Sequence, residues 1–172
     1  TAHNTGCTGH AGVCGKKSDT ANLQDKLTGS LIGLARAVKT FHPTDRSDEL
    51  ILKGLFTTIT NVNFNNDTIR TLIDEVHDEK RKIDQNTEDY DTSNLWNANE
   101  DIRSLKSLIL FGLRGMAAYA YHAYALSYTD REVFDFFYEG LAALGENYDM
   151  DHLLPLVLKT GEINFKCMKL LD

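Results

Sequence analysis

Two cysteines, Cys7 and Cys14, lie among glycines near the start of this 172-residue chain, in the stretch TGCTGHAGVCGK. A thiolate is a nucleophile and a metal ligand, and glycines let the backbone turn closely around a metal cluster and direct amide groups at its sulfur atoms. An iron–sulfur cluster or a structural zinc ion normally has four ligands, and this region offers only these cysteines with His3 and His10. Spacing alone therefore leaves three alternatives open: a metal site, a local disulfide, or two free thiols.

A second group of candidate residues lies in GLRGMAAYAYHAYALSY, where Tyr121, Tyr124 and Tyr128 follow at steps of three and four residues. One interpretation is a tyrosine stripe around a redox centre, with His122 as a ligand or proton relay. The simpler and more common arrangement is close helix packing with the phenol hydroxyl groups at the edge of the core. In that arrangement His122 is a hydrogen-bonded structural residue.

The remaining candidates have structural explanations. Cys167 stands beside Met168 on an apolar helix and is expected to be a small buried hydrophobic residue. The charged run from Glu75 to Lys82 is expected to be a solvated helix face with internal ion pairs. No nucleophile elbow, P-loop, HExxH or dinucleotide-binding fingerprint occurs, so the sequence predicts no self-sufficient active site.

Composition narrows the function classes further. Hydrophobic residues make up 42% and charged residues 25% of the chain, which is typical of a globular protein. The formal net charge of −7 argues against nucleic acid or an anionic membrane as a partner. Three cysteines are an odd number, so a complete disulfide framework is not expected and a reducing cytoplasm is the predicted location.

The elements that must position these residues are predicted to be helices, because apolar residues recur at steps of three and four. The first three stripes are Leu23, Leu27, Leu31, Leu34, Val38 and Phe41; Leu50, Leu55, Ile59 and Val62; and Ile69, Ile73 and Val76. Ser18 or Asp19 is expected to cap the first helix, and Asn65 lies in the cap cluster of the third. Residues 85–99 are polar and are predicted to connect two halves.

In the second half, Asn99 is expected to cap a long apolar helix that lies deep between neighbours. Its stripe is Ile102, Leu105, Leu108, Ile109, Leu113, Met116, Ala117 and Ala120. A further helix carries Val133, Phe137, Leu141 and Leu144. Two short helices are expected to follow, from about Asp151 to Lys159, with Pro155 near its start, and from Glu162 towards Leu171. No strand pattern is present, so the predicted fold class is all-α, with two consecutive three-helix bundles.

Several stretches together resemble one family, the hybrid cluster proteins, also called prismane proteins or hydroxylamine reductases. The stretches, in chain order, are TAHNTGCTGHAGVCGK with TANLQDKL, GLFTTITNVNFNND, NEDIRSLKSLILFGLRGMAAYAYHA and TGEINFKCMKLLD. The resemblance covers essentially the whole chain and places it in the carbon monoxide dehydrogenase superfamily. It implies the N-terminal helical domain of such a protein. The expected organisation is a cysteine- and glycine-rich cluster-binding loop at 1–18, bundles at 19–84 and 100–172, and the connection at 85–99.

The resemblance also implies a role for the two cysteines. In this family a Cys-x-x-Cys pair just upstream of the position of Thr1 joins the matches of Cys7 and Cys14 in binding a proximal iron–sulfur cluster. Carried over, Cys7 and Cys14 are expected to be iron ligands and half of the ligand set, with a 4Fe–4S cluster expected rather than 2Fe–2S. A structural zinc ion held by these cysteines and the nearby histidines is a further alternative.

Neighbouring residues are expected to support that cluster. Gly6, Gly12 and Gly15 would permit amide contacts to its sulfur atoms. Lys16 and the N-terminus of the helix near Asp19 would place positive potential beside its negative charge.

For the whole protein, the resemblance implies two Rossmann-like domains after Asp172. They would carry a hybrid iron–sulfur–oxygen cluster that reduces hydroxylamine or nitric oxide with electrons from a redox partner protein. This chain departs from the family pattern in two places: the upstream cysteines, and roughly twenty residues between LWNAN and EDIRSL. Because the hybrid cluster would lie in the following domains, this part is expected to transfer electrons within the whole protein and not to be catalytically competent alone. The alternative is a non-enzymatic helical module for interaction or assembly.

Overall fold

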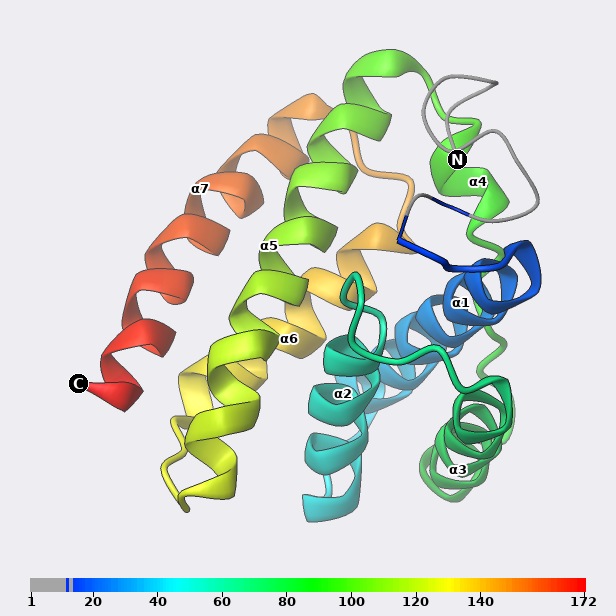
Figure 1. Ribbon diagram of the computed structural model, residues 1–172. Helices are drawn as coiled ribbons and strands as arrows, with labels where there is room; N and C mark the ends of the chain where they lie inside the picture. Colours follow the sequence, from blue (N-terminus) through cyan, green and yellow to red (C-terminus); the bar gives the residue numbers. More distant parts are fainter. Residues whose placement is uncertain (1–11, 13) are drawn as a thin grey trace.

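The computed structural model describes residue 12 and residues 14–172, which form an all-helical structure without a β-strand in that part of the chain (Figure 1). This confirms the predicted fold class. The helices are α1 (Ser18–Thr40), α2 (Asp45–Thr57), α3 (Asn66–Ile83), α4 (Ser93–Trp96), α5 (Glu100–Ala125), α6 (Arg131–Leu144), α7 (Met150–Met168) and the 3-10 helix η1 (Lys169–Leu171). Within the described residues, no helix combines the length and apolar character needed to cross a membrane.

Local capping explains where most helices begin. Asn65 Oδ1 accepts hydrogen bonds from the backbone of the first turn of α3, and Asn99 Oδ1 accepts one from Ile102 N at 2.9 Å, as predicted. The predicted cap of α1 is wrong, because that helix begins at Ser18 and its N-cap residue Lys17 makes no side-chain bond. The Asp19 carboxylate is already inside the first turn.

The end of the chain departs from prediction, because one long helix, α7, replaces the two expected short ones. Pro155 lies inside α7, and Gly161 does not interrupt it. Tertiary packing overrides these local breakers. The buried side of α7 comprises Leu153, Thr160, Ile163 and Cys167, which recur at helical spacing along the length that packs against α5.

Helices of the two predicted halves pack against each other as well as within each half. α1 lies against α3, α2 and α6, and α2 lies against α5, so one contiguous apolar cluster runs through both (Figure 1). A buried hydroxyl also joins them: Tyr138 of α6 lies 2.7 Å from Ser47 Oγ and donates to Asp48 Oδ1 at 2.8 Å. The division into 19–84 and 100–172 stays a prediction.

Not every predicted stripe residue is buried. Phe41 lies just beyond the end of α1 and is half exposed, and Val62 lies in the loop after α2. Leu108 is 55% exposed, because α5 buries only part of its circumference in this chain. The prediction that the long helix lies deep between neighbours is therefore wrong for its outer face.

The connection at 85–99 is held closely against α1. Tyr90 N donates to Gly29 O at 3.1 Å, and a Cβ atom at Gly29 would stand 2.2 Å from Tyr90 O, so a larger residue at 29 would force the backbones apart. The neighbouring Asp89 accepts hydrogen bonds from Ser30 of α1 and pairs with Lys80 of α3.

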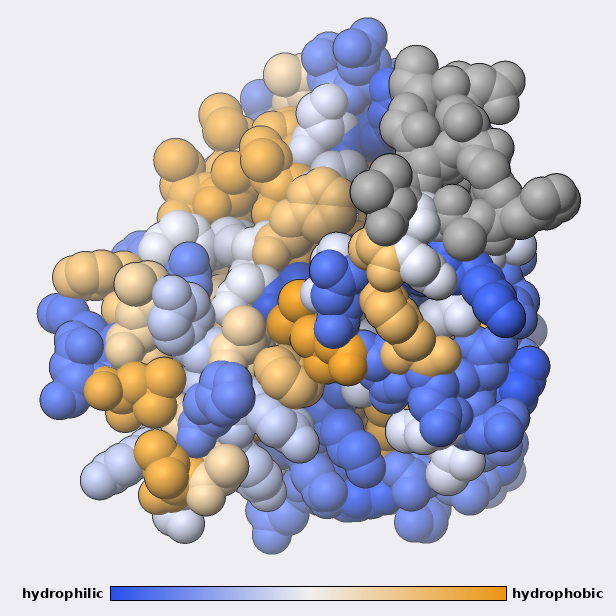
Figure 2. All heavy atoms as spheres, in the orientation of Figure 1, coloured by the Kyte–Doolittle hydropathy of each residue, from blue (hydrophilic) through white to orange (hydrophobic). Residues whose placement is uncertain are grey.

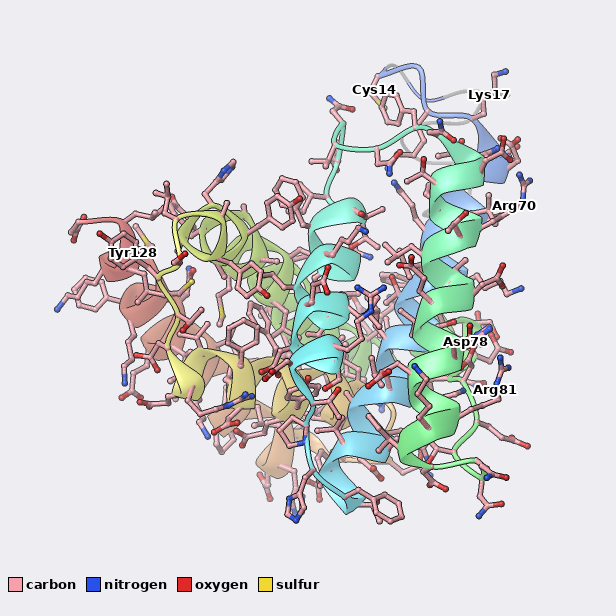
Figure 3. All side chains as sticks on the ribbon, turned by 90° about the horizontal axis from the view of Figure 1, so that it is seen from below. Cys14, Lys17, Arg70, Asp78, Arg81 and Tyr128 are labelled. Atoms are coloured by element: carbon pink, nitrogen blue, oxygen red, sulfur yellow. The ribbon has the colours of Figure 1, made fainter. Side chains whose placement is uncertain are left out.

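This arrangement corrects the prediction for the charged run of α3. Glu79 and Lys80 are only 4% and 7% exposed. Glu79 accepts a hydrogen bond from Thr44 Oγ1 at 2.6 Å, while Lys80 turns towards the connection. The exposed pair of Asp78 and Arg81 on the same helix fits the prediction (Figure 3).

Candidate functional site

Cys14 lies in a tight turn immediately before α1. Gly15 N donates to Gly12 O at 2.8 Å, and Gly12 N donates to Lys16 O at 2.7 Å. Gly15 has φ +84°, a left-handed conformation that glycine adopts at no steric cost. The Cys14 thiol is exposed, and it forms no disulfide with another described cysteine. The turn therefore presents a thiol to solvent from a backbone that the two glycines allow to close.

The turn is anchored by Lys16 and a buried glutamine. Lys16 Nζ donates to Gln24 Oε1 at 2.7 Å, and Gln24 is only 4% exposed on α1. Gln24 Nε2 in turn donates to Thr57 O at 3.3 Å and Asn63 O at 3.1 Å, at the end of α2 and in the loop before α3. These bonds fix the residue next to the turn to two separate parts of the fold.

Several predicted supporting residues occupy the expected region. Gly12 and Gly15 form the turn itself. Lys16, Lys17 and the first turn of α1 follow directly, so the positive end of the helix dipole lies close in the chain to Cys14 (Figure 3). The other predicted residues, His3, Gly6, Cys7 and His10, lie outside the described residues.

Sequence reasoning missed a second polar group deeper in the fold. Arg114 of α5 donates from Nε to Thr58 Oγ1 and from Nη2 to Thr28 Oγ1, each at 3.1 Å. Burial raises the pKa of Asp25 on α1, and the positive charges of Arg114 and Lys16 oppose this rise. Burial likewise lowers the pKa of Arg114, and Asp25 opposes this fall. The available signal was a single arginine inside the apolar run LILFGLRGM.

Of the tyrosine stripe, Tyr121 has the packing role that the simpler interpretation predicts. Tyr121 stacks on Phe56 with ring centroids 4.2 Å apart, whereas Tyr124 and Tyr128 are exposed. Tyr128 lies on the opposite side of the molecule from Cys14 (Figure 3). The prediction of a hydrogen-bonded structural His122 is wrong: its side chain is exposed, makes no hydrogen bond to another described residue, and stands edge-on to the Phe56 and Tyr121 rings.

Cys167 is a buried hydrophobic residue, as predicted. Its side chain is 0% exposed and its Sγ lies 3.5 Å from Met116 O. Burial raises the pKa of this thiol to about 11, which makes it a poor nucleophile and a poor metal ligand.

The described residues include a suitable metal donor, but they supply too few donors for a complete metal centre. Cys14 supplies a thiolate donor that suits iron or zinc. However, residue 12 and residues 14–172 bring together no group of three or more histidine, cysteine or carboxylate side chains able to hold a metal ion. A complete ligand set therefore needs donors other than the described ones.

Comparison with known proteins identifies the family of this chain. The model of the Prismane/CO dehydrogenase family matches residues 2–172. The chain is similar to the hydroxylamine reductases of Halothermothrix orenii, 38% identical over 99% of this chain, and Thermodesulfovibrio yellowstonii, 37% identical over 94% of it. The chain spans about 37% of the length of these relatives. The first alignment runs over 208 positions, so that relative carries residues inside the matched region that this chain lacks. The chain belongs to the Prismane/CO dehydrogenase family.

Proposed function

We propose that this chain is the N-terminal helical, iron–sulfur-binding part of a hydroxylamine reductase-like hybrid cluster protein. The observation that carries the proposal is the exposed Cys14 thiol on a glycine turn, directly before the uncapped start of α1, in a chain of this family. Cys7 and Cys14 would be two of the four iron ligands, and the proposed cluster is 4Fe–4S rather than 2Fe–2S. When bound, such a cluster supplies reversible one-electron transfer.

The chain's own residues would hold and tune this group. The Gly12–Gly15 turn orients the Cys14 thiol, and the anchor through Lys16 and Gln24 keeps the turn against α1. Lys16 and the start of α1 would place positive potential beside the negative charge of the bound cluster.

In the whole protein, this part would pass electrons from a redox partner protein towards the hybrid cluster in two Rossmann-like domains. There, hydroxylamine or nitric oxide would be reduced in the cytoplasm. The relatives' name, hydroxylamine reductase, supports this class of reaction. The chain alone would not catalyse the reduction.

Anaerobic reconstitution with iron and sulfide tests the proposal. The chain would be compared with a version carrying a Cys-x-x-Cys segment before Thr1, in which about four iron atoms per chain are expected. Cys14→Ser should abolish iron binding in that version, whereas Cys167→Ser should retain it because Cys167 is buried elsewhere. Iron and sulfide contents with the EPR spectrum of the reduced protein distinguish 4Fe–4S from 2Fe–2S. Failure of the extended version to bind iron would refute the proposal.

A non-enzymatic helical interaction or assembly module is the second candidate. It is favoured by the described residues, which bring together no group of three or more metal donors and form one contiguous helical core. A stable, colourless extended protein with free thiols would support it. Stoichiometric zinc in elemental analysis would instead support a structural zinc site.

A further inference from the structure

Helices α5 and α7 present large apolar side chains to solvent along one strip each. The members are Leu108, Phe111 and Tyr119 on α5 and Leu154, Leu158 and Phe165 on α7, and their exposed fractions run from 41% to 70%. The two helices pack directly on each other. Figure 2 shows hydrophobic residues gathered on the side of the molecule that these helices form, whereas the side formed by α3 is mostly hydrophilic. We call these two strips the α5–α7 outer face.

Four of the nearby charged side chains are held on other sides of their helices, whereas the exposed Glu162 beside Gly161 makes no ion pair with another described residue. Lys106 donates to Leu144 O at 2.9 Å, at the end of α6, and Arg114 points to the threonines of α1 and α2. On α7, Lys159 pairs with Glu139 of α6 at 2.6 Å, and Lys166 lies 3.6 Å from Asp130. A partner could therefore cover the outer face without burying these charges unpaired, which would be costly.

The glycines of the helices give an independent indication. Helices α1, α2, α5, α6 and α7 contain seven glycines, and at five of them an added Cβ would come within 3.0 Å of another part of this chain. The exceptions are Gly115 of α5 and Gly161 of α7, where an added Cβ would meet no atom of the described residues within 4 Å. A glycine inside a helix lowers helix stability relative to alanine. The packing of this chain does not explain these two, and both lie at exposed positions of the outer strips.

The exposed apolar strips and the two unexplained glycines are both accounted for if another protein surface packs against the outer face. Glycine lets another backbone come close to a helix, and large exposed apolar side chains are typical of a face that is covered in the assembled protein. The occupant must be largely apolar and large enough for two strips. The relatives carry a portion of that size, because this chain spans only about 37% of their length.

We propose that the α5–α7 outer face docks against the part of a hydroxylamine reductase-length protein that this chain does not span, with the closest approach at Gly115 and Gly161. This inference rests on one part of the proposed function, namely that the chain belongs to a longer protein. It is independent of the cluster, so it can be tested with iron-free protein and can fail while cluster binding succeeds.

Hydroxyl-radical footprinting with mass spectrometry tests the docking. The chain alone would be compared with a chimera in which it replaces the matched part of the Halothermothrix orenii protein. Oxidation of Phe111, Tyr119 and Phe165 should fall several-fold in the chimera, whereas oxidation of Phe41, half exposed after α1, should not change. Unchanged oxidation of the strip would overturn the proposal. So would protection that rises with the concentration of the chain alone, because the occupant would then be a second copy.

Glycine substitution gives a second test, which compares the effect of each substitution in the chain alone with its effect in the chimera. In the chain alone, Gly115→Ala and Gly161→Ala should each lower the unfolding equilibrium constant about fourfold, because alanine favours the helix and meets no neighbour. The matched control Gly112→Ala should raise it, since that Cβ would stand 2.3 Å from Thr160 Cγ2. In the chimera, the first two substitutions should instead lower the thermal midpoint. A loss of stability in the chain alone would overturn the proposal.

Discussion

Removal of the Asp89 carboxylate measures how strongly the connection at 85–99 is held. Asp89 Oδ2 lies 2.7 Å from Ser30 Oγ and 2.6 Å from His77 Nε2, and Oδ1 accepts from Lys80 Nζ. Hydrogen bonds to a charged group contribute about 1.5–3 kcal/mol each, and breaking a fully buried ion pair costs about 3–5 kcal/mol. The Asp89 side chain is 31% exposed and the Lys80 side chain 9%, so water partly replaces the lost partner. We expect Asp89→Ala to lower the free energy of unfolding by about 2–3 kcal/mol.

The pH dependence follows from the same contacts. Burial alone would raise the pKa of Asp89, but the hydrogen bonds from Lys80, Ser30 and His77 outweigh burial and hold the pKa below its ordinary value of 3.8. A carboxylate with a lowered pKa in the folded state contributes stability that is present above the unfolded-state pKa and is lost as pH falls through the folded-state pKa. The difference between wild type and Asp89→Ala should therefore be complete above about pH 5 and should shrink in the acid range below the ordinary pKa.

Urea denaturation at several pH values is the assay, and Glu88→Ala is the matched control. Glu88 is the exposed neighbour of Asp89, so its loss should change the free energy of unfolding by less than about 0.5 kcal/mol. Lys80→Met combined with Asp89→Ala should cost less than the sum of the single losses, because both remove the same pair. Equal effects of Asp89→Ala and Glu88→Ala, or a difference that persists unchanged at low pH, would refute the reasoning.

Three further predictions follow from single contacts. Iodoacetamide at pH 8 should alkylate Cys14 and spare Cys167, because a pKa of about 11 leaves only about one Cys167 thiol in a thousand ionised; equal labelling in peptide mass spectrometry would contradict this. Tyr138→Phe should cost about 1–2 kcal/mol in urea denaturation, since Asp48 loses a hydroxyl donor between the halves; an unchanged midpoint would count against that bridge. Lys106→Met should cost about 1–3 kcal/mol, because two backbone carbonyl groups at the end of α6 lose their donor; a variant as stable as wild type would show that water satisfies them.

Local signals predicted the helices well where the sequence carries both a stripe and a cap. Asn65 and Asn99 each cap a helix because an asparagine side chain bonds the first-turn amides wherever the chain enters from an extended conformation. The unbroken α7 was not predictable in the same way. Pro155 and Gly161 are local breakers, and only the burial of one side of α7 against α5 shows that the helix continues through them.

The candidate site likewise has one part that the local sequence predicts and one part that it does not. The turn around Cys14 was predictable, because glycine, cysteine and lysine adjacent in the sequence are adjacent in space. Its anchor was not, since Gln24 looks like an ordinary polar residue until Thr57 and Asn63, from distant parts of the chain, accept its hydrogen bonds. A polar residue within an apolar stripe becomes buried, and burial requires hydrogen-bond partners. Those partners come from distant parts of the chain, so the local sequence does not predict them.

Helix α5 connects the proposed site with the proposed docking face. Its two inner cations, Lys106 and Arg114, bond to α6 and to the threonines of α1 and α2, and both bonding patterns need the side chains to turn away from solvent. This inward use of charge is what leaves Leu108, Phe111 and Tyr119 as an uncharged outer strip. The polar network beside the Cys14 turn and the apolar outer face are thus two sides of one helix.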